Sequence, residues 1–265
     1  TGVDLRHETY EFAPNADGFN CVSTLSTGAR DVLLCPGNTA VPKVSRNIGA
    51  VYGELAVPVI KNLDLQLALR HDQYSKIGGT TNPKVGLRYA PMNNLTFRAS
   101  AGTGFRAPSM NDLYRSVKVS ETATLPDPVC MAENDNDLGF CANNWETRTY
   151  SNAKLKPEKS RQFSLGVLTD PSPYLSLGVD YWNIQKSNLI STLGVDVILN
   201  DLNKYGSLVH RYWDATLPAD CEDGADPDDY AICGIDLIKE NRGKQRISGL
   251  DLGFSLTGLK TGFGQ

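Results

Sequence analysis

A strict alternation of apolar and polar residues is the feature that most limits how this chain can fold. In residues 63–70, leucine fills every second position and alternates with Asp, Gln, Ala and Arg. Successive side chains of a β-strand point to opposite faces, so a period of two predicts a strand. The pattern recurs in residues 3–11, 48–59, 63–70, 83–90, 95–102, 161–168, 175–182 and 246–256. The sequence therefore predicts an all-β chain of about eight strands.

The connections between these strands fall into two classes. Three are short and contain turn-forming residues, in the segments 60–62, 91–94 and 169–173. The connections at 12–46, 108–153 and 191–244 are long, and the one at 76–81 is of modest length. Every second connection is short, so in an antiparallel up-and-down sheet all short turns lie at one end. Short periplasmic turns opposite long extracellular loops are typical of transmembrane β-barrels.

The two faces of the predicted strands differ in charge. The apolar face carries no charge through the strand centres and comprises Val51, Leu55, Val57, Val85, Leu87, Tyr89, Phe163, Leu165, Val167, Leu250, Leu252, Phe254 and Leu256. The other face comprises Asp4, Arg6, Glu54, Asp64, Arg70, Asp72, Lys84, Arg88, Arg98, Arg106, Asp180 and Asp251. A lipid-facing charge at the bilayer midplane costs roughly 2–4 kcal/mol, whereas a wet lumen accepts both signs. A soluble antiparallel sheet with one buried face shows the same alternation, so this pattern alone leaves both classes open.

Composition excludes other classes of protein. No apolar run approaches the roughly 18–20 residues of a membrane-spanning helix. The net charge of -4 argues against a nucleic-acid partner, which needs a basic face. The chain begins with Thr1 rather than Met, and the pattern predicts the start of a further strand near Gln265, so we expect a segment cut at both ends.

The six cysteines form three close pairs, each within one predicted loop. The pairs are Cys21 with Cys35, Cys130 with Cys141, and Cys221 with Cys233. No pair has C-x-x-C spacing and the histidines lie far away in sequence, which argues against a metal site. Nearest-neighbour pairing predicts three local disulfides and therefore an oxidising compartment.

Several segments resemble, in serial order, the strand motifs of TonB-dependent receptors. The most specific is LTFRASAGTGFRAPS at residues 95–109, followed by NDLY at 111–114. The others are VYGEL at 51–55, LALRHDQY at 67–74, NPKVGLRYAP at 82–91, LKPEKS at 155–160, YWNI at 181–184 and SGLD at 248–251. The resemblance covers about residues 45–260.

This resemblance implies a barrel of about 22 strands with a plugged lumen. Residues 1–265 then form a partial outer-membrane barrel domain without the plug and the C-terminal strands. The implied function is TonB-energised uptake of a scarce nutrient, such as siderophore-iron, haem, cobalamin or a glycan. The implied partners are TonB with its inner-membrane motor, acting through the plug, the nutrient itself and outer-membrane lipid.

Two motifs of other protein classes are present by chance. Residues 102–107 match the dinucleotide-binding pattern G-x-G-x-x-A, but that pattern requires a helix to open immediately, and here the alternation continues to Arg106. The acidic stretch 220–229 does not have the spacing of an EF-hand loop and is interpreted as a solvated loop. No catalytic constellation stands out, so we expect neither an enzyme nor a resident cofactor or metal.

Ligand contacts are expected in the long loops and on the upper lumenal face. The residues singled out there are Arg70, Asp72, Arg106 and Trp182. For Arg106 a structural role, as an ion pair within the wall, is the simpler interpretation. Two alternatives to active uptake remain open: a passive porin, which lacks a plug, and a soluble secreted β-protein such as a lectin or glycosidase.

Overall fold

The computed structural model describes residues 1–12, 41–115, 117–211 and 232–257. Its main element is an antiparallel sheet of eight strands in the order β1-β2-β3-β4-β5-β10-β11-β14. The bounds are β1 Gly2–Phe12, β2 Val41–Ile60, β3 Leu63–Tyr74, β4 Gly78–Met92, β5 Leu95–Arg106, β10 Glu158–Ser172, β11 Leu175–Ser191 and β14 Glu240–Leu256. All eight predicted strands are therefore present, and each pairs with its neighbour along this order.

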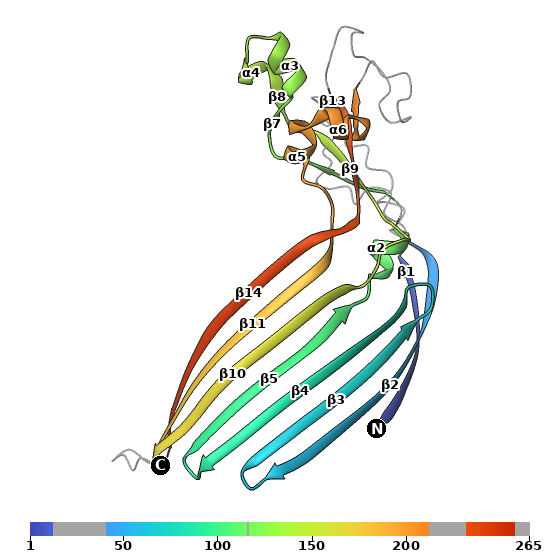
Figure 1. Cartoon of the computed structure of the whole chain (residues 1–265). Helices are drawn as coiled ribbons and strands as arrows, with labels where there is room; N and C mark the ends of the chain where they lie inside the picture. Colours follow the sequence, from blue (N-terminus) through green and yellow to red (C-terminus); the bar gives the residue numbers. More distant parts are fainter. Residues whose placement is uncertain (13–40, 116, 212–231, 258–265) are drawn as a thin grey trace, which may run out of the picture.

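Figure 1 shows the sheet as one curved, tilted layer with an open edge at β1 and another at β14. The short turns β2–β3, β4–β5 and β10–β11 lie together at the lower end of this view. The connections β5–β10 and β11–β14 leave from the opposite end. This separation of short and long connections confirms the arrangement predicted from the sequence.

The turns differ from the prediction in their exact positions. Lys61-Asn62 forms the expected turn, and Asn62 adopts the left-handed conformation with φ 68°, which asparagine tolerates. Strand β10 continues to Ser172, so Asp170 and Pro171 belong to the strand rather than to the turn. The expected connection at 76–81 is shorter than predicted, because β3 ends at Tyr74 and β4 begins at Gly78. One short hairpin therefore lies at the long-loop end.

The apolar face defined above is exposed along the whole sheet. Most of its residues are more than a third exposed, for example Leu55 at 58% and Leu165 at 55% within the sheet and Leu252 at 74% on the edge strand β14. A sheet that exposes so many large apolar side chains needs an apolar environment on that face, because patches of this kind are rare on soluble monomers. None of the helices in the described part of the chain is long and apolar enough to cross a membrane.

The opposite, polar face is organised by ion pairs between strands. Arg98 on β5 donates through Nε to Asp180 Oδ1 on β11 at 2.7 Å, across the intervening β10. Arg88 on β4 lies 3.3 Å from Asp64 on β3. Because these charged residues alternate with the apolar ones, each strand places its charged side chains on the polar face and its apolar side chains on the opposite face. Arg70 and Arg106 form further ion pairs on this face.

The described parts of the β5–β10 and β11–β14 connections fold into a separate unit above the sheet, which we call the loop module. Its first half contains α2 Met110–Tyr114, β6 Lys118–Glu121, β7 Leu125–Pro126, α3 Pro128–Glu133, α4 Leu138–Cys141, β8 Ala142–Asn143 and β9 Glu146–Tyr150. Its second half contains α5 Val195–Asn200, α6 Leu202–Tyr205, η2 Gly206–Leu208, β12 Val209–Arg211 and β13 Ile232–Ile238. The period-two analysis did not predict these short helices or the second sheet.

Candidate functional site

The loop module joins the β5–β10 and β11–β14 connections through one small sheet. This sheet has the order β12-β13-β9-β6, and its central pair, β13 with β9, is parallel. Thr147 pairs with Ile235 and Tyr150 with Ile238, so backbone hydrogen bonds link two segments far apart in the sequence. In Figure 1 the module stands above the ends of β11 and β14. The two connections therefore form one body rather than two independent loops.

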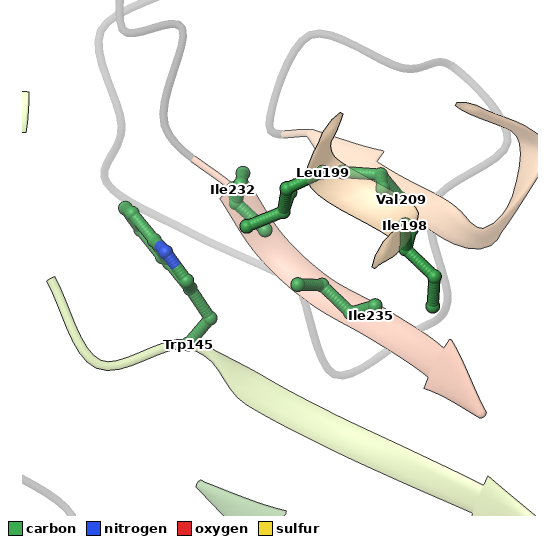
Figure 2. Packing of buried hydrophobic residues seen from close by; sticks show 6 residues of the cluster. All are labelled: Trp145, Ile198, Leu199, Val209, Ile232 and Ile235. Atoms are coloured by element: carbon green, nitrogen blue, oxygen red, sulfur yellow. The ribbon is translucent and has the colours of Figure 1, made fainter. Parts of the chain in front are cut away.

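A compact apolar core holds this body together. Figure 2 shows its buried side chains, which are Trp145, Ile198, Leu199, Val209, Ile232 and Ile235. Ile198 and Ile235 are fully inaccessible. The indole Nε1 of Trp145 donates to the carbonyl of Leu125 at 3.1 Å, so the ring is buried without an unpaired polar atom. Both halves of the module supply core residues, which explains why they fold together.

A buried ion pair connects the same two halves. Arg211 donates from Nη1 to Asp127 Oδ2 at 2.5 Å and from Nη2 to Oδ1 at 2.7 Å. Both side chains are almost completely buried. Asp127 Oδ1 also accepts from the backbone N–H of Val129 and thereby caps α3. This two-pronged geometry, which only arginine provides, compensates two charges that the module removes from water.

The first half is further restrained by the Cys130–Cys141 disulfide, which joins α3 to the end of α4. This bridge confirms one of the three predicted pairs. Cys233 is disulfide-bonded as well. Cys221 and the predicted pair Cys21–Cys35 lie outside the described residues.

We expect non-reducing peptide mapping of the purified protein to find three local bridges, Cys21–Cys35, Cys130–Cys141 and Cys221–Cys233. Each pair lies within one connection, so closing it requires no movement of the sheet. Mass spectrometry of the proteolytic peptides before and after reduction identifies the partners. A bridge between cysteines of two different connections would contradict the local scheme.

The module is fixed to the sheet close to the start of β14. Lys239 Nζ lies 2.6 Å from Asp112 Oδ1 of α2, and its carbonyl accepts from Asn152 Nδ2 at 2.9 Å. Burial alone would raise the pKa of the Asp112 carboxyl, but hydrogen bonds from Lys239 and Ser109 outweigh it and hold this pKa below its ordinary value. Asp112 is therefore charged at neutral pH and holds α2 to Lys239, the residue between β13 and β14.

Arg70 and Asp72, two of the predicted ligand residues, form one cluster near the upper end of β3. Arg70 Nη2 lies 2.9 Å from Asp72 Oδ1 and 3.3 Å from Asp4 Oδ2 on β1. The Arg70 guanidinium also lies over the ring of Tyr52, 5.5 Å from its centroid. Asp72 is buried, while Arg70 remains partly exposed. The cluster links β1, β2 and β3 and keeps one cation accessible.

Arg106 and Trp182 lie in two other places on the polar face. Arg106 donates through Nε to Glu158 Oε2 at 2.8 Å, and Glu158 Oε1 accepts from the backbone of Ile190 at 2.9 Å. Trp182 donates from its indole to Asp251 Oδ2 at 3.0 Å. Its ring lies against Gly249, where an added Cβ would be 2.6 Å from the ring, so the SGLD segment needs glycine at this position.

The four predicted ligand residues therefore share the polar face but form three separate clusters. Each has a partner within the wall, which is what a structural role requires, and their role in ligand binding stays a prediction. The sequence analysis missed the core of the loop module and the Asp127–Arg211 pair. The only sequence signal for this core is the apolar residues around Ile198 and Ile235. These apolar segments are too short to show a helical or strand period. Within the described ranges, no group of three or more metal-ligating side chains gathers.

Comparison with known proteins identifies the family of this wall. The profile described as "TonB dependent receptor-like, beta-barrel" matches residues 2–264. No curated protein matches the sequence. The siderophore receptor PirA from Acinetobacter baumannii is similar in structure, with a TM-score of 0.59 at 16% identity over 96% of this chain. A mutant ferric enterobactin receptor, PfeA from Pseudomonas aeruginosa in complex with enterobactin, gives a TM-score of 0.58 at 18% identity over 94%.

A third similar structure is a double mutant of the Serratia marcescens hemophore receptor HasR, in complex with its hemophore HasA and heme. It gives a TM-score of 0.51 at 14% identity over 82% of this chain. The chain spans 31%, 29% and 32% of the lengths of these three receptors. At such identities the likeness concerns the fold, while the profile covers nearly the whole chain. The chain is thus a section of barrel wall, and it belongs to the TonB-dependent receptor β-barrel family.

Proposed function

We propose that this chain is part of an outer-membrane receptor that imports an iron-containing ligand with energy supplied through TonB. The observation that carries this proposal is the folded loop module at the long-loop end of a wall of this family. A passive pore needs no folded unit above its mouth, whereas a receptor needs a preformed surface to capture a dilute ligand. The polar face below the module supplies charged groups of both signs for a ligand that passes inward.

The ligand class follows from the similar structures, as part of the same proposal. PirA is described as a siderophore receptor, PfeA as a ferric enterobactin receptor and HasR as a hemophore receptor. We therefore propose a ferric siderophore first and haem second. The proposed ligand surface is the loop module together with Arg70, Asp72, Arg106 and Trp182. The relatives support transport rather than catalysis.

Energy dependence follows from the tightness that capture requires. At a Kd of about 1 nM, release opposes about 12 kcal/mol at standard state. Release therefore needs a second state of lower affinity, which an energised partner must create, since a ligand shifts an equilibrium only by its differential affinity. In this proposal, TonB creates that state by moving the plug.

The test is uptake of radioiron-labelled ferric enterobactin and of haem by cells that express the full-length protein, with and without TonB. Surface binding is measured in parallel at low temperature. We expect binding to be equal in the two strains and import to be lost without TonB. Import of either probe that persists without TonB, at a rate linear in concentration, would instead establish a passive porin.

A further inference from the structure

Four cations lie on the apolar face of the sheet, at the end that carries the loop module. They are Lys159 and Arg161 on β10 and Lys244 and Arg246 on β14. The register aligns Arg161 with Gln185 of β11 and Gln185 with Arg246, and it aligns Lys159 with Ser187 and Ser187 with Lys244. The cations therefore form two short rows across three neighbouring strands. Phe163 follows Lys159 and Arg161 on the same face of β10.

These cations differ from those of the polar face in having no carboxylate beside them. All four side chains are exposed. In residues 159–169, 175–187 and 244–256 the only carboxylates are Asp180 and Asp251, and both belong to the polar face. Arg98 and Arg106, in contrast, each meet a carboxylate across the polar face. The four outward cations thus form a patch of uncompensated positive charge.

The position of this patch along the strands matches the level of lipid headgroups. The rings of Phe163 and Tyr181 pack 5.9 Å apart on the apolar face. Phe163 lies two residues, and Tyr181 four residues, along the strands from the row of Arg161 and Gln185. Aromatic residues of barrels mark the membrane interface above the apolar band. Phe163 lies two positions along β10 from Arg161, about 7 Å of strand length. Basic residues at this level attract anionic headgroups.

A groove on the same face leads from the patch into the apolar band. It has a volume of about 980 Å³, and its apolar lining includes Leu55, Leu67, Val85, Ala101 and Phe163. Small side chains such as Ala101 leave this space open between larger neighbours. Arg161 and Gln185 line the same groove. One continuous surface therefore offers apolar walls below and a cation above.

The junction between groove and patch contains an unpaired hydrogen-bond donor. Asn183 lines the groove and is only 1% exposed. Its Oδ1 accepts from Gln185 Nε2 at 3.3 Å, but its Nδ2 has no partner. A buried donor without an acceptor is costly, so an acceptor supplied by a bound molecule would stabilise this arrangement. Ester carbonyls and phosphate oxygens of a lipid lie at this depth.

We propose that this surface binds one molecule of a glycolipid whose headgroup carries two phosphates, such as the lipid A of the outer leaflet. The phosphates contact Lys159, Arg161, Lys244 and Arg246, and an acyl chain lies in the groove beside Leu67 and Ala101. Two rows of cations across three strands suit two phosphates better than one. The assignment to the outer leaflet rests on the proposed function, which places the long-loop end outside.

The test uses full-length protein in a neutral detergent, titrated with lipid A and analysed by native mass spectrometry. We expect the double variant Arg161→Ser/Arg246→Ser to bind lipid A roughly 30-fold more weakly, since each interfacial cation contributes about 1 kcal/mol. The matched control Arg88→Ser/Lys186→Ser removes the same charge from the polar face, outside the groove lining, and should bind normally. The variant Arg161→Lys/Arg246→Lys keeps the charge and should also bind, which separates charge from folding.

Two further titrations decide the headgroup chemistry. Dephosphorylated lipid A should bind the wild-type protein even more weakly than lipid A binds the serine variant, because the variant keeps Lys159 and Lys244. Phosphatidylglycerol, with one phosphate, should bind more weakly than lipid A, and equal affinity would overturn the choice of a two-phosphate headgroup. Equal binding of lipid A by the wild type and the serine variant would overturn the site. Neither result affects binding of ferric enterobactin or haem by the same samples, so failure of the proposed function is recognised separately.

Discussion

Full-length protein that carries Leu67→Arg together with Leu177→Arg is expected to fail to assemble in the membrane. Both leucines belong to the exposed apolar face, at 41% and 38% exposure. An arginine on the lipid-facing side of a barrel costs roughly 2–4 kcal/mol near the midplane. Two such changes cost up to about 8 kcal/mol, which is comparable with the whole stability of a typical protein. The loss of heat-modifiable mobility on gels measures this failure.

The matched control moves each arginine by one residue, to Gln66→Arg and Ser176→Arg. These neighbours point to the polar face, where Asp64 and Asp170 already lie close in sequence. The control protein should assemble and keep its heat-modifiable mobility. Equal assembly of the two double variants would show that the face we describe as apolar does not contact lipid.

Replacement of Arg211 by alanine is expected to unfold the loop module while the sheet stays assembled. The change leaves the buried Asp127 carboxylate without its cation, and such a loss costs roughly 3–5 kcal/mol. It also removes the link between α3 and β12. Limited proteolysis of the purified full-length protein measures the result, since new cleavage should appear within residues 118–150 and 195–211.

The exposed pair Arg242–Glu240 supplies the control, because both side chains are about two-fifths exposed. Arg242→Ala should change the proteolysis pattern little, since exposed ion pairs contribute about 0–1 kcal/mol. Protection of the module that survives in Arg211→Ala would mean that the apolar core around Trp145 suffices without the ion pair.

The sheet was predictable from the sequence because its signal is local and repeated. Every second residue from Leu63 to Leu69 is apolar, and the same period is met in all eight strands. Hairpin connections then fix the order of the strands, since neighbours in sequence become neighbours in the sheet. The turn at Asn62 was also predictable, because its signal is local: a turn-forming residue between two alternating segments. The end of β10 at Ser172 was missed, because Pro171 lies at an irregularity in the β10–β11 register, where proline is compatible with a strand.

The loop module was not predictable in this way. Its helices are short. Its central contact is the parallel pairing of β9 with β13, and a periodic sequence pattern does not predict such a pairing. The Asp127–Arg211 pair joins residues whose proximity depends on that long-range contact. For Arg70, Asp72, Arg106 and Trp182 the sequence predicted the correct face but not their partners. Those partners depend on the register between strands, which sequence periodicity does not specify.

The parallel pairing of β9 with β13 also sets an order of events during folding. The whole β10–β11 hairpin lies between these two segments in the chain, so their association closes a long loop. That closure has a high entropic cost unless the β10–β11 hairpin has already formed. The formed hairpin places the start of β10 beside the end of β11, from which the two connections leave. The sheet therefore forms first and brings the two connections together. The loop module, which forms the surface above the sheet, folds last.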